Sequence, residues 1–511
     1  MSEQFFGKTF FWSLAIVFGL FLLAIASSLF DLAFPVLLIL GTIVGVACAK
    51  HPTFGLMAVF LELLSNPHGH LISTENPIPF SLRMAVFVGF FAGYGIYLIR
   101  TKTLPHINRF FFLLLLPLVA AVLIGFLRGV ILEDFSAAFQ DGNAYLYLLY
   151  AIPILSADWQ SSQRRQFLQV FAAGAVWNIF MSLGILYVFT HFGEDVLRTM
   201  YVFLRDRRLA EITNVGAGVY RVFMQSQFFV MGFGALLIPL FLQRYPAKDL
   251  RLIAILLSGV IATMLLSLSR SFWVGMIVAC VALFFLLMRN RYGLRAWKSL
   301  ILHAVFSIVG AVALIVLVTL FPFPSQRVDG RDLAEALRLR TEADVAISSR
   351  WMLLEPMRQA IMEYPILGNG FGSSVSSVTD DPRVREIHPD GVWTTSSMEW
   401  GWLELWLKMG IIGPLAFLFL FVMIVRQFFL QKKSDTVWIG TGLIVGLVFL
   451  YATHAFSPYL NHPIGLGFIL FTLFFLPDSP TSLEDPVKTQ EALNTPQETR
   501  LPASALSPQA E

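Results

Sequence analysis

The chain has 511 residues, of which 57% are hydrophobic and only 14% are charged. Soluble globular proteins carry about 25% charged residues, so this composition excludes an ordinary soluble protein and indicates a membrane protein. The formal net charge of +3 is small and carries no nucleic-acid signature. Cys48 and Cys280 both fall in apolar runs, which predicts small core residues and neither a disulfide nor a metal site.

The order of apolar runs predicts an all-α polytopic membrane protein with about 12 to 14 transmembrane helices, because each span needs about 20 apolar residues. Weaker runs at 53–64 and 142–156 are expected to be short or re-entrant. The stronger expected spans are 10–29, 33–49, 81–99, 108–127, 166–190, 220–243, 252–268, 271–288, 300–321, 401–425, 437–453 and 463–477.

Lysine and arginine in the short loops set the expected orientation, since such residues favour the cytoplasmic side. With fourteen spans they fall on one side and both termini are cytoplasmic. The loop after Phe321 then faces the periplasm of a Gram-negative cell. The residues on the cytoplasmic side are Lys50, Arg100, Lys102, Arg164, Arg165, Arg244, Lys248, Arg251, the cluster from Arg289 to Lys298, Lys432 and Lys433.

The chain is expected to divide into four parts: N-terminal transmembrane helices at 1–321, an extracytoplasmic loop at 322–397, C-terminal transmembrane helices at 398–477 and a cytoplasmic tail at 478–511. The tail is rich in Pro, Ser, Thr, Glu and Gln, which predicts disorder.

The extracytoplasmic loop shows one clear local pattern. Ser348 to Tyr364 reads as a helix that Pro365 closes. Three alternating glycines after it, at 368, 370 and 372, are expected to make a flexible turn.

Arginines on the expected periplasmic side are the first candidate site residues. Five of them lie between 191 and 221, where topology does not require positive charge: Arg198, Arg205, Arg207, Arg208 and Arg221. An anionic partner explains them, and so does a span count that is off by one or a contact with lipid headgroups.

Arg270 lies between two apolar runs with almost no spacer, flanked by Ser267, Ser269 and Ser271. Arginine at the bilayer centre costs roughly 2.5 to 3.5 kcal/mol, so a position at a helix end is expected. A guanidinium aimed into a cavity and a snorkelling arginine in a tight hairpin both fit.

Arg350 begins the expected loop helix, and its fork-shaped guanidinium suits phosphate or pyrophosphate. A solvated helix face is the plain alternative.

A further cluster of His388, Trp393, Glu399, Trp400 and Trp402 precedes the span at 401–425. The tryptophans fit an interfacial belt, or less commonly a sugar-stacking surface. Glu399 is a candidate general base.

Two other pairs are simpler to interpret. Glu404 and Lys408 stand at i,i+4 and are expected to pair with each other. The histidines at 68 and 70 have no third ligand nearby in the sequence, so no metal site is predicted.

Three stretches resemble the bacterial O-antigen ligase and polymerase family, membrane enzymes that move glycans from undecaprenyl-pyrophosphate carriers. They are LLSLSRSFWVG at 265–275, SSRWMLLEPMRQAIMEYPILGNGFG at 348–372 and WLELWLKMGIIG at 402–413. The second is the most specific, and the best-matched block runs from about residue 215 to 425.

The resemblance implies that Arg221, Arg270 and Arg350 bind the pyrophosphate of a lipid-linked glycan. It implies a glycosyltransferase without a cofactor, which passes the glycan to a glycan or lipid acceptor at the outer face of the bacterial inner membrane. The family's loop histidine falls on Glu399 here. This departure leaves open a different base, a different acceptor or lost activity, with His388 as the fallback base.

Two other function classes fit the same features. Many spans with buried arginines suit a transporter of a lipid-linked or anionic solute, although no repeated pair of broken helices is evident. A non-catalytic relative in polysaccharide assembly is the third hypothesis, and the glutamate at position 399 is its main support.

Overall fold

A computed structural model describes residues 2–76, 78–216, 219–243, 245–289, 293–324, 351–379, 382–430 and 437–476. By internal contacts the chain divides into two units, Met1–Leu476 and Pro477–Glu511. The second unit, with the predicted disordered tail, lies outside the described residues. All that follows concerns the first unit, and the expected four-part division stays a prediction.

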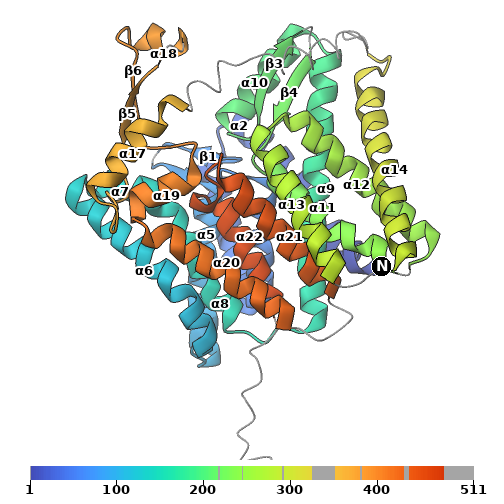
Figure 1. The fold of residues 1–511 in the computed structure, drawn as a ribbon, viewed down its shortest axis with the longest axis horizontal. Helices are drawn as coiled ribbons and strands as arrows, with labels where there is room; N and C mark the ends of the chain where they lie inside the picture. The colour runs from blue at the N-terminus through green and yellow to red at the C-terminus, as the bar shows by residue number, and fades with distance from the viewer. Residues whose placement is uncertain are drawn as a thin grey trace, which may run out of the picture. The chain divides into compact units, whose positions relative to one another are not determined.

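The described chain is almost entirely helical, which confirms the predicted all-α polytopic membrane fold (Figure 1). Ten described helices are long and apolar enough to cross a bilayer: α2 (Lys8–Leu29), α3 (Ala33–Lys50), α5 (Leu82–Thr101), α6 (Arg109–Leu132), α9 (Ser161–His191), α12 (Ala247–Ser267), α13 (Arg270–Arg289), α14 (Leu294–Thr319), α20 (Ile412–Leu430) and α21 (Val437–His454).

Shorter apolar helices complete the bundle. They are α4 (Pro52–Ser65), α11 (Gln227–Leu237) with its continuation η2 (Ile238–Leu242), and α22 (Pro463–Phe474). The remaining described helices are α1 (Ser2–Phe5), α7 (Phe135–Gly142), η1 (Asn143–Tyr150), α8 (Ala151–Leu155), α10 (Glu194–Asp206), α17 (Leu354–Glu363), α18 (Pro382–Ile387), α19 (Gly401–Met409) and η4 (Tyr459–Asn461).

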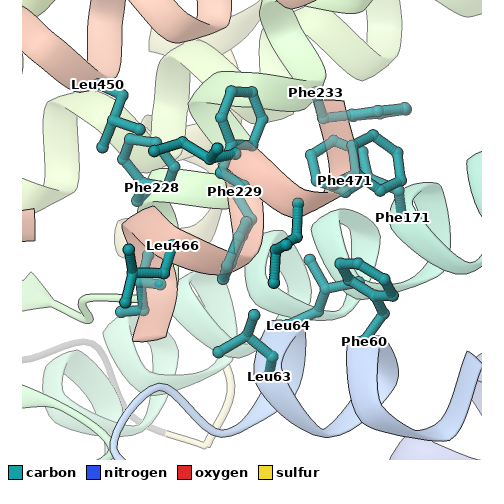
Figure 2. Packing of buried hydrophobic residues seen from close by; sticks show 14 of the residues in the cluster. Phe60, Leu63, Leu64, Phe171, Phe228, Phe229, Phe233, Leu450, Leu466 and Phe471 are labelled. Atoms are coloured by element: carbon teal, nitrogen blue, oxygen red, sulfur yellow. The ribbon is translucent and has the colours of Figure 1, made fainter. Parts of the chain in front are cut away.

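The short helices form the centre of the bundle. Every residue of α11 and of α22 is buried, whereas only a few residues of α14 are. A helix that is hydrophobic all round must be covered by other helices or by lipid. In Figure 2, phenylalanines of α9, α11 and α22 pack with leucines of α4, and the rings of Phe171 and Phe471 stack at 4.5 Å.

Close backbone contact joins α3 to α5. Gly41 and Gly45 of α3 face Gly89 and Gly93 of α5, and a Cβ atom on either α5 glycine would meet a carbonyl of α3. Small residues four apart let membrane helices approach in this way.

Three two-stranded antiparallel hairpins interrupt the helices: β1 (Ser73–Thr74) with β2 (Phe80–Ser81), β3 (Glu211–Gly216) with β4 (Val219–Phe223), and β5 (Val375–Val378) with β6 (Val392–Thr395). The β4 strand corrects the span expected at 220–243, because its helix begins only at Gln227. Buried hydrogen bonds stabilise the junction between β4 and α11. Gln227 donates to Ser182 Oγ at 3.0 Å and to the Val222 carbonyl at 3.1 Å.

The span expected at 401–425 is also two helices, α19 and α20. Gly410 separates them with φ +64° and ψ −173°, a backbone conformation that only glycine adopts readily.

The loop segment contains a small hydrophobic cluster separate from the main core. It joins α17 and β5 to α19 through six buried residues, Leu353, Met357, Ile361, Val375, Met398 and Leu407. The helix expected from 348 to 364 is described only in part, as α17, and it ends before Pro365 as predicted. The packed cluster fixes α17 against the start of α19.

Candidate functional site

The turn between α12 and α13 is the structural centre of the candidate site. Leu268 has φ +44°, the left-handed conformation, and α13 begins two residues later at Arg270. The Ser269 amide donates to Ser267 Oγ at 3.2 Å, and the hydroxyls of Ser269 and Ser271 share a hydrogen bond of 3.0 Å. These local serine contacts explain how two apolar helices join with almost no spacer.

Arg221 reaches this turn from strand β4. Its Nε donates to the Ser267 carbonyl at 2.8 Å, and its guanidinium lies over the Phe223 ring at 4.8 Å. Glu211, on β3, is 3.9 Å from the guanidinium, and the Arg221 side chain is 17% exposed. Arg270 is exposed and lies three residues after Ser267. The structure therefore brings Arg221 and Arg270 to the same turn.

The loop between α21 and α22, residues 455–462, packs against the same turn. Ser457 Oγ donates to Ser271 Oγ at 3.0 Å. Tyr459 stacks on Phe228 at 5.2 Å and lies 6.0 Å from Phe272, the third residue of α13. The loop therefore covers the start of α13 with a polar and an aromatic side chain.

Tyr459 is a site residue that sequence reasoning did not identify. Its hydroxyl is buried and makes no hydrogen bond to the described residues. Burial raises the pKa of Tyr459, Glu211 raises it further, and Arg221 opposes the shift, so the phenol is neutral and close to both charges. Buried polar atoms normally have a partner, so this hydroxyl is available to a ligand or a water.

The start of α19 meets the same loop from the other side. The Trp400 ring is 5.4 Å from Phe456 and 5.2 Å from Trp351. A Cβ atom on Gly401 would collide with the His454 carbonyl, so the α19 backbone lies directly against the end of α21. Glu399, exposed and one residue before Trp400, is thereby held beside the 455–462 loop.

The other two predicted site residues are placed differently. Arg350 lies outside the described residues, although Trp351, its neighbour in the chain, contacts Trp400. His388 is exposed at the tip of the β5–β6 hairpin, with its ring 6.2 Å from Trp393. Figure 1 shows this hairpin and α18 projecting from the helices, and strand β6 separates His388 from Glu399.

A buried ion cluster joins α19 to α7 and to the chain just before α19. Lys408 Nζ donates to Glu404 Oε1 at 2.6 Å, to Asp141 Oδ1 at 2.6 Å and to the Ser396 carbonyl at 2.8 Å. The predicted Glu404–Lys408 pair is confirmed, but Asp141 of α7 is a third member that sequence spacing did not indicate. The side chains of Lys408 and Glu404 are only 3% and 4% exposed.

The glycine turn at 368–372 is anchored, which corrects the expectation of a flexible turn. All three glycines have φ between +75° and +92°, and Arg128 Nε donates to the Gly368 carbonyl at 2.7 Å. Four consecutive amides, at 369, 370, 371 and 372, donate respectively to the carbonyls of Leu407, Lys408 and Gly125 and to Asp141 Oδ2. The turn therefore clamps α17 to α6, α7 and α19.

Histidines elsewhere do not assemble a metal site in the described part of the chain. His68 contacts His462, with ring centroids 5.2 Å apart. No group of three His, Cys, Asp or Glu side chains among the described residues is placed to hold a metal ion.

Comparison with protein families identifies one match. Residues 252–418 match the family model described as O-antigen ligase. Comparison with curated proteins and with solved structures gives no match. The matched segment contains the α12–α13 turn, the glycine turn, the buried lysine and Glu399, whereas Arg221 precedes it. It lies within the block of resemblance seen in the sequence and supports that resemblance. The chain is a polytopic membrane protein, and its segment 252–418 is similar to the O-antigen ligase family.

Proposed function

We propose that this protein transfers a glycan from an undecaprenyl-pyrophosphate carrier to an acceptor hydroxyl, at the outer face of the bacterial inner membrane. The observation that carries the proposal is the largely buried Arg221 guanidinium at the α12–α13 turn, where Arg270 begins α13. The nearby Tyr459 hydroxyl has no hydrogen-bond partner among the described residues. The family match supports membrane glycan assembly as the broader activity.

The reaction needs positive charge at the leaving group. The acceptor oxygen attacks the anomeric carbon, the bond from that carbon to the pyrophosphate oxygen breaks, and the carrier departs as a pyrophosphate anion. Guanidinium groups held in a partly dry site stabilise the anion as it forms, because they need no reorganisation. Arg221 and Arg270 would bind the pyrophosphate, with Arg350 as a further predicted ligand.

A base must take the proton of the acceptor hydroxyl. We assign this role to Glu399, because the packing of Trp400 on Phe456 holds the carboxylate beside the 455–462 loop. A carboxylate serves as general base when it comes within hydrogen-bond reach of the hydroxyl. His388 lies at the tip of the hairpin, beyond strand β6, which favours Glu399 over it.

The positive-inside distribution supports a periplasmic location for this site. It puts the β3–β4 hairpin, the α12–α13 turn, the long loop and the 455–462 loop on one side of the membrane. A polyprenyl carrier is soluble only in lipid, so a bundle with many exposed apolar helices suits such a donor.

Replacing Arg221 or Arg270 by alanine is expected to lower glycan formation in cells by about a hundredfold or more, because one preorganised charge at the reaction centre is worth that much. The measurement is the amount of polymeric or ligated glycan at equal protein level. Arg221→Lys keeps the charge but loses the fork geometry, so intermediate activity is expected. Arg198→Ala, on the exposed face of α10, is the matched control. Normal glycan in both alanine variants would overturn the proposal.

Glu399→Gln is expected to lower the rate roughly a hundredfold or more, the usual contribution of a general base, while His388→Ala keeps nearly full activity. The measurement is glycan transfer by each purified variant at saturating donor. Full activity of the glutamine variant together with loss in the alanine variant would move the role of base to His388.

A further inference from the structure

A polar pocket of about 450 Å³ lies beside the β3–β4 hairpin, apart from the α12–α13 turn. This volume falls in the range of about 300 to 1,000 Å³ that holds small ligands. Its walls come from three separate parts of the chain, which include His68 from the loop after α4, Arg205 and Arg208 at the end of α10, and Thr213 and Phe223 of the hairpin.

Two arginines, Arg205 and Arg208, and one carboxylate, that of Glu211, line this pocket, so its lining carries a small net positive charge. Arg208 is held in the left-handed conformation, with φ +51°, and its guanidinium makes no hydrogen bond or ion pair within the described residues. Arg205 pairs at 2.8 Å with Asp206, and the carboxylate of Glu211 is 68% exposed. Arg208 is thus a cation on the pocket wall that can bind an anion. Its left-handed backbone conformation costs free energy in a residue other than glycine.

His68 adds a neutral hydrogen-bonding group to the wall. Burial lowers the pKa of His68 to about 4, and the positive charges of Arg83 and Arg208 lower it further. The imidazole is therefore uncharged at neutral pH and both donates and accepts hydrogen bonds.

Two aromatic rings give the pocket faces suited to a sugar. Tyr201 of α10 and Phe223 of β4 line it, and the Thr213 hydroxyl lies on the neighbouring strand. A pyranose presents C–H groups on one face and hydroxyls at its rim, so aromatic walls with polar groups between them match its chemistry. Arg208 beside them, with no ion pair among the described residues, favours a sugar that carries a negative charge.

The pocket is coupled in space to the proposed pyrophosphate site. Phe223 lines the pocket and also lies beneath the Arg221 guanidinium, while Thr213 is the cross-strand partner of Arg221. A sugar in the pocket would thus lie beside a group bound at Arg221, because Phe223 is two residues from Arg221 and Thr213 is paired directly with it.

We infer that this pocket binds an anionic sugar, one that bears a carboxylate or a phosphate, in the donor glycan next to the carrier pyrophosphate. The inference rests on the proposed function for the identity of the donor. It assigns to Arg208 the recognition of the sugar's charge and to Phe223 the contact shared between sugar and pyrophosphate sites.

The test is ligand binding to the full chain in lipid nanodiscs, measured by ligand-observed NMR at moderate ionic strength. The probes are glucuronate, glucose 1-phosphate, glucose and inorganic phosphate. We expect one or both charged sugars to bind at least about tenfold more tightly than glucose and than inorganic phosphate. Arg208→Gln is expected to weaken that binding about tenfold, the value of one charge-assisted hydrogen bond. Arg198→Gln, on α10 but outside the pocket lining, is expected to leave it unchanged.

The two charged probes distinguish a carboxylate-bearing from a phosphate-bearing sugar. Equal binding of glucose and the charged sugars would overturn the inference, and so would equal loss in the two arginine variants or binding of inorganic phosphate as tight as that of glucose 1-phosphate. Charged-sugar binding by a protein that transfers no glycan would contradict the proposed function and leave the pocket standing. Glycan transfer without any charged-sugar binding would support the proposed function and overturn the assignment of the pocket.

Discussion

Replacing Lys408 by methionine is expected to lower the free energy of unfolding by about 3 to 5 kcal/mol, the usual result of removing one partner of a buried ion pair. Among the described residues, Lys408 forms the ion pairs of both Glu404 and Asp141. Without Lys408, the carboxylates of Glu404 and Asp141 lie in the same buried site with no cation between them. Asp141, which accepts a hydrogen bond from the Gly372 amide, is then destabilised. The measurement is thermal or denaturant unfolding of the detergent-solubilised protein.

The control for this variant is the exposed Glu355–Arg358 pair on α17. Arg358→Ala is expected to leave the stability unchanged within error, because solvent screens an ion pair of this kind. Adding Glu404→Gln to Lys408→Met is expected to recover part of the loss. Equal stability of Lys408→Met and the wild type would show that the cluster does not stabilise the packing of α19 on α7.

Replacing Gly410 by alanine is expected to cost about 2 to 5 kcal/mol, the sum of a backbone conformation reserved for glycine and an overpacked contact. A Cβ atom at this position would meet the carbonyl of Ile366, and the hydrogen bond from the Ile411 amide to the Pro365 carbonyl, 3.0 Å long, would have to give way. The expected consequence is release of the 365–372 segment from α19. Limited proteolysis of this segment and thermal unfolding measure the effect.

Gly19→Ala in α2 is the matched control, since a Cβ atom there meets nothing within 4 Å. It is expected to leave both the cleavage pattern and the unfolding temperature close to those of the wild type. Resistance of the Gly410 variant to proteolysis, with unchanged stability, would show that Gly410 does not attach the 365–372 segment to α19.

Hydropathy indicated the spans of the bundle because a helix in lipid needs a long apolar run, whatever it packs against. The same signal could not mark the end of β4 or the break at Gly410, since both lie within apolar stretches. There, a buried glutamine and a backbone contact decide the local structure. The lesson is that hydropathy gave the length of these runs and tertiary contacts set where each helix begins.

In the candidate site, too, some residues were predictable from the sequence and others depend on tertiary contacts. Arg270 was recognisable in the sequence because a cation between two apolar runs is costly, and Arg221 because topology does not require positive charge in its segment. The i,i+4 spacing of Glu404 and Lys408 predicted their pairing, but Asp141 is 267 positions from Lys408, and no local pattern connects them. Tyr459 lies in a short loop whose residues look like an ordinary connection, and only its packing against α11 and α13 reveals it.

The glycine turn was visible as a motif, but its role was not. Alternating glycines suggest freedom of the backbone, and here they permit positive φ angles and close approach to α6 and α19. The motif therefore supplies a rigid attachment of α17 to α6, α7 and α19, which helps to explain how Glu399, just before α19, is held at a fixed place.

The most direct test of the account is turnover by the purified protein in nanodiscs with an undecaprenyl-pyrophosphate-linked glycan as donor. The account predicts transfer of glycan to an acceptor and release of free carrier pyrophosphate in equal amounts, with both products reduced about a hundredfold in Arg221→Ala. Movement of the intact lipid-linked glycan across the bilayer without transfer, or equal turnover by the wild type and the Arg221 variant, would contradict it.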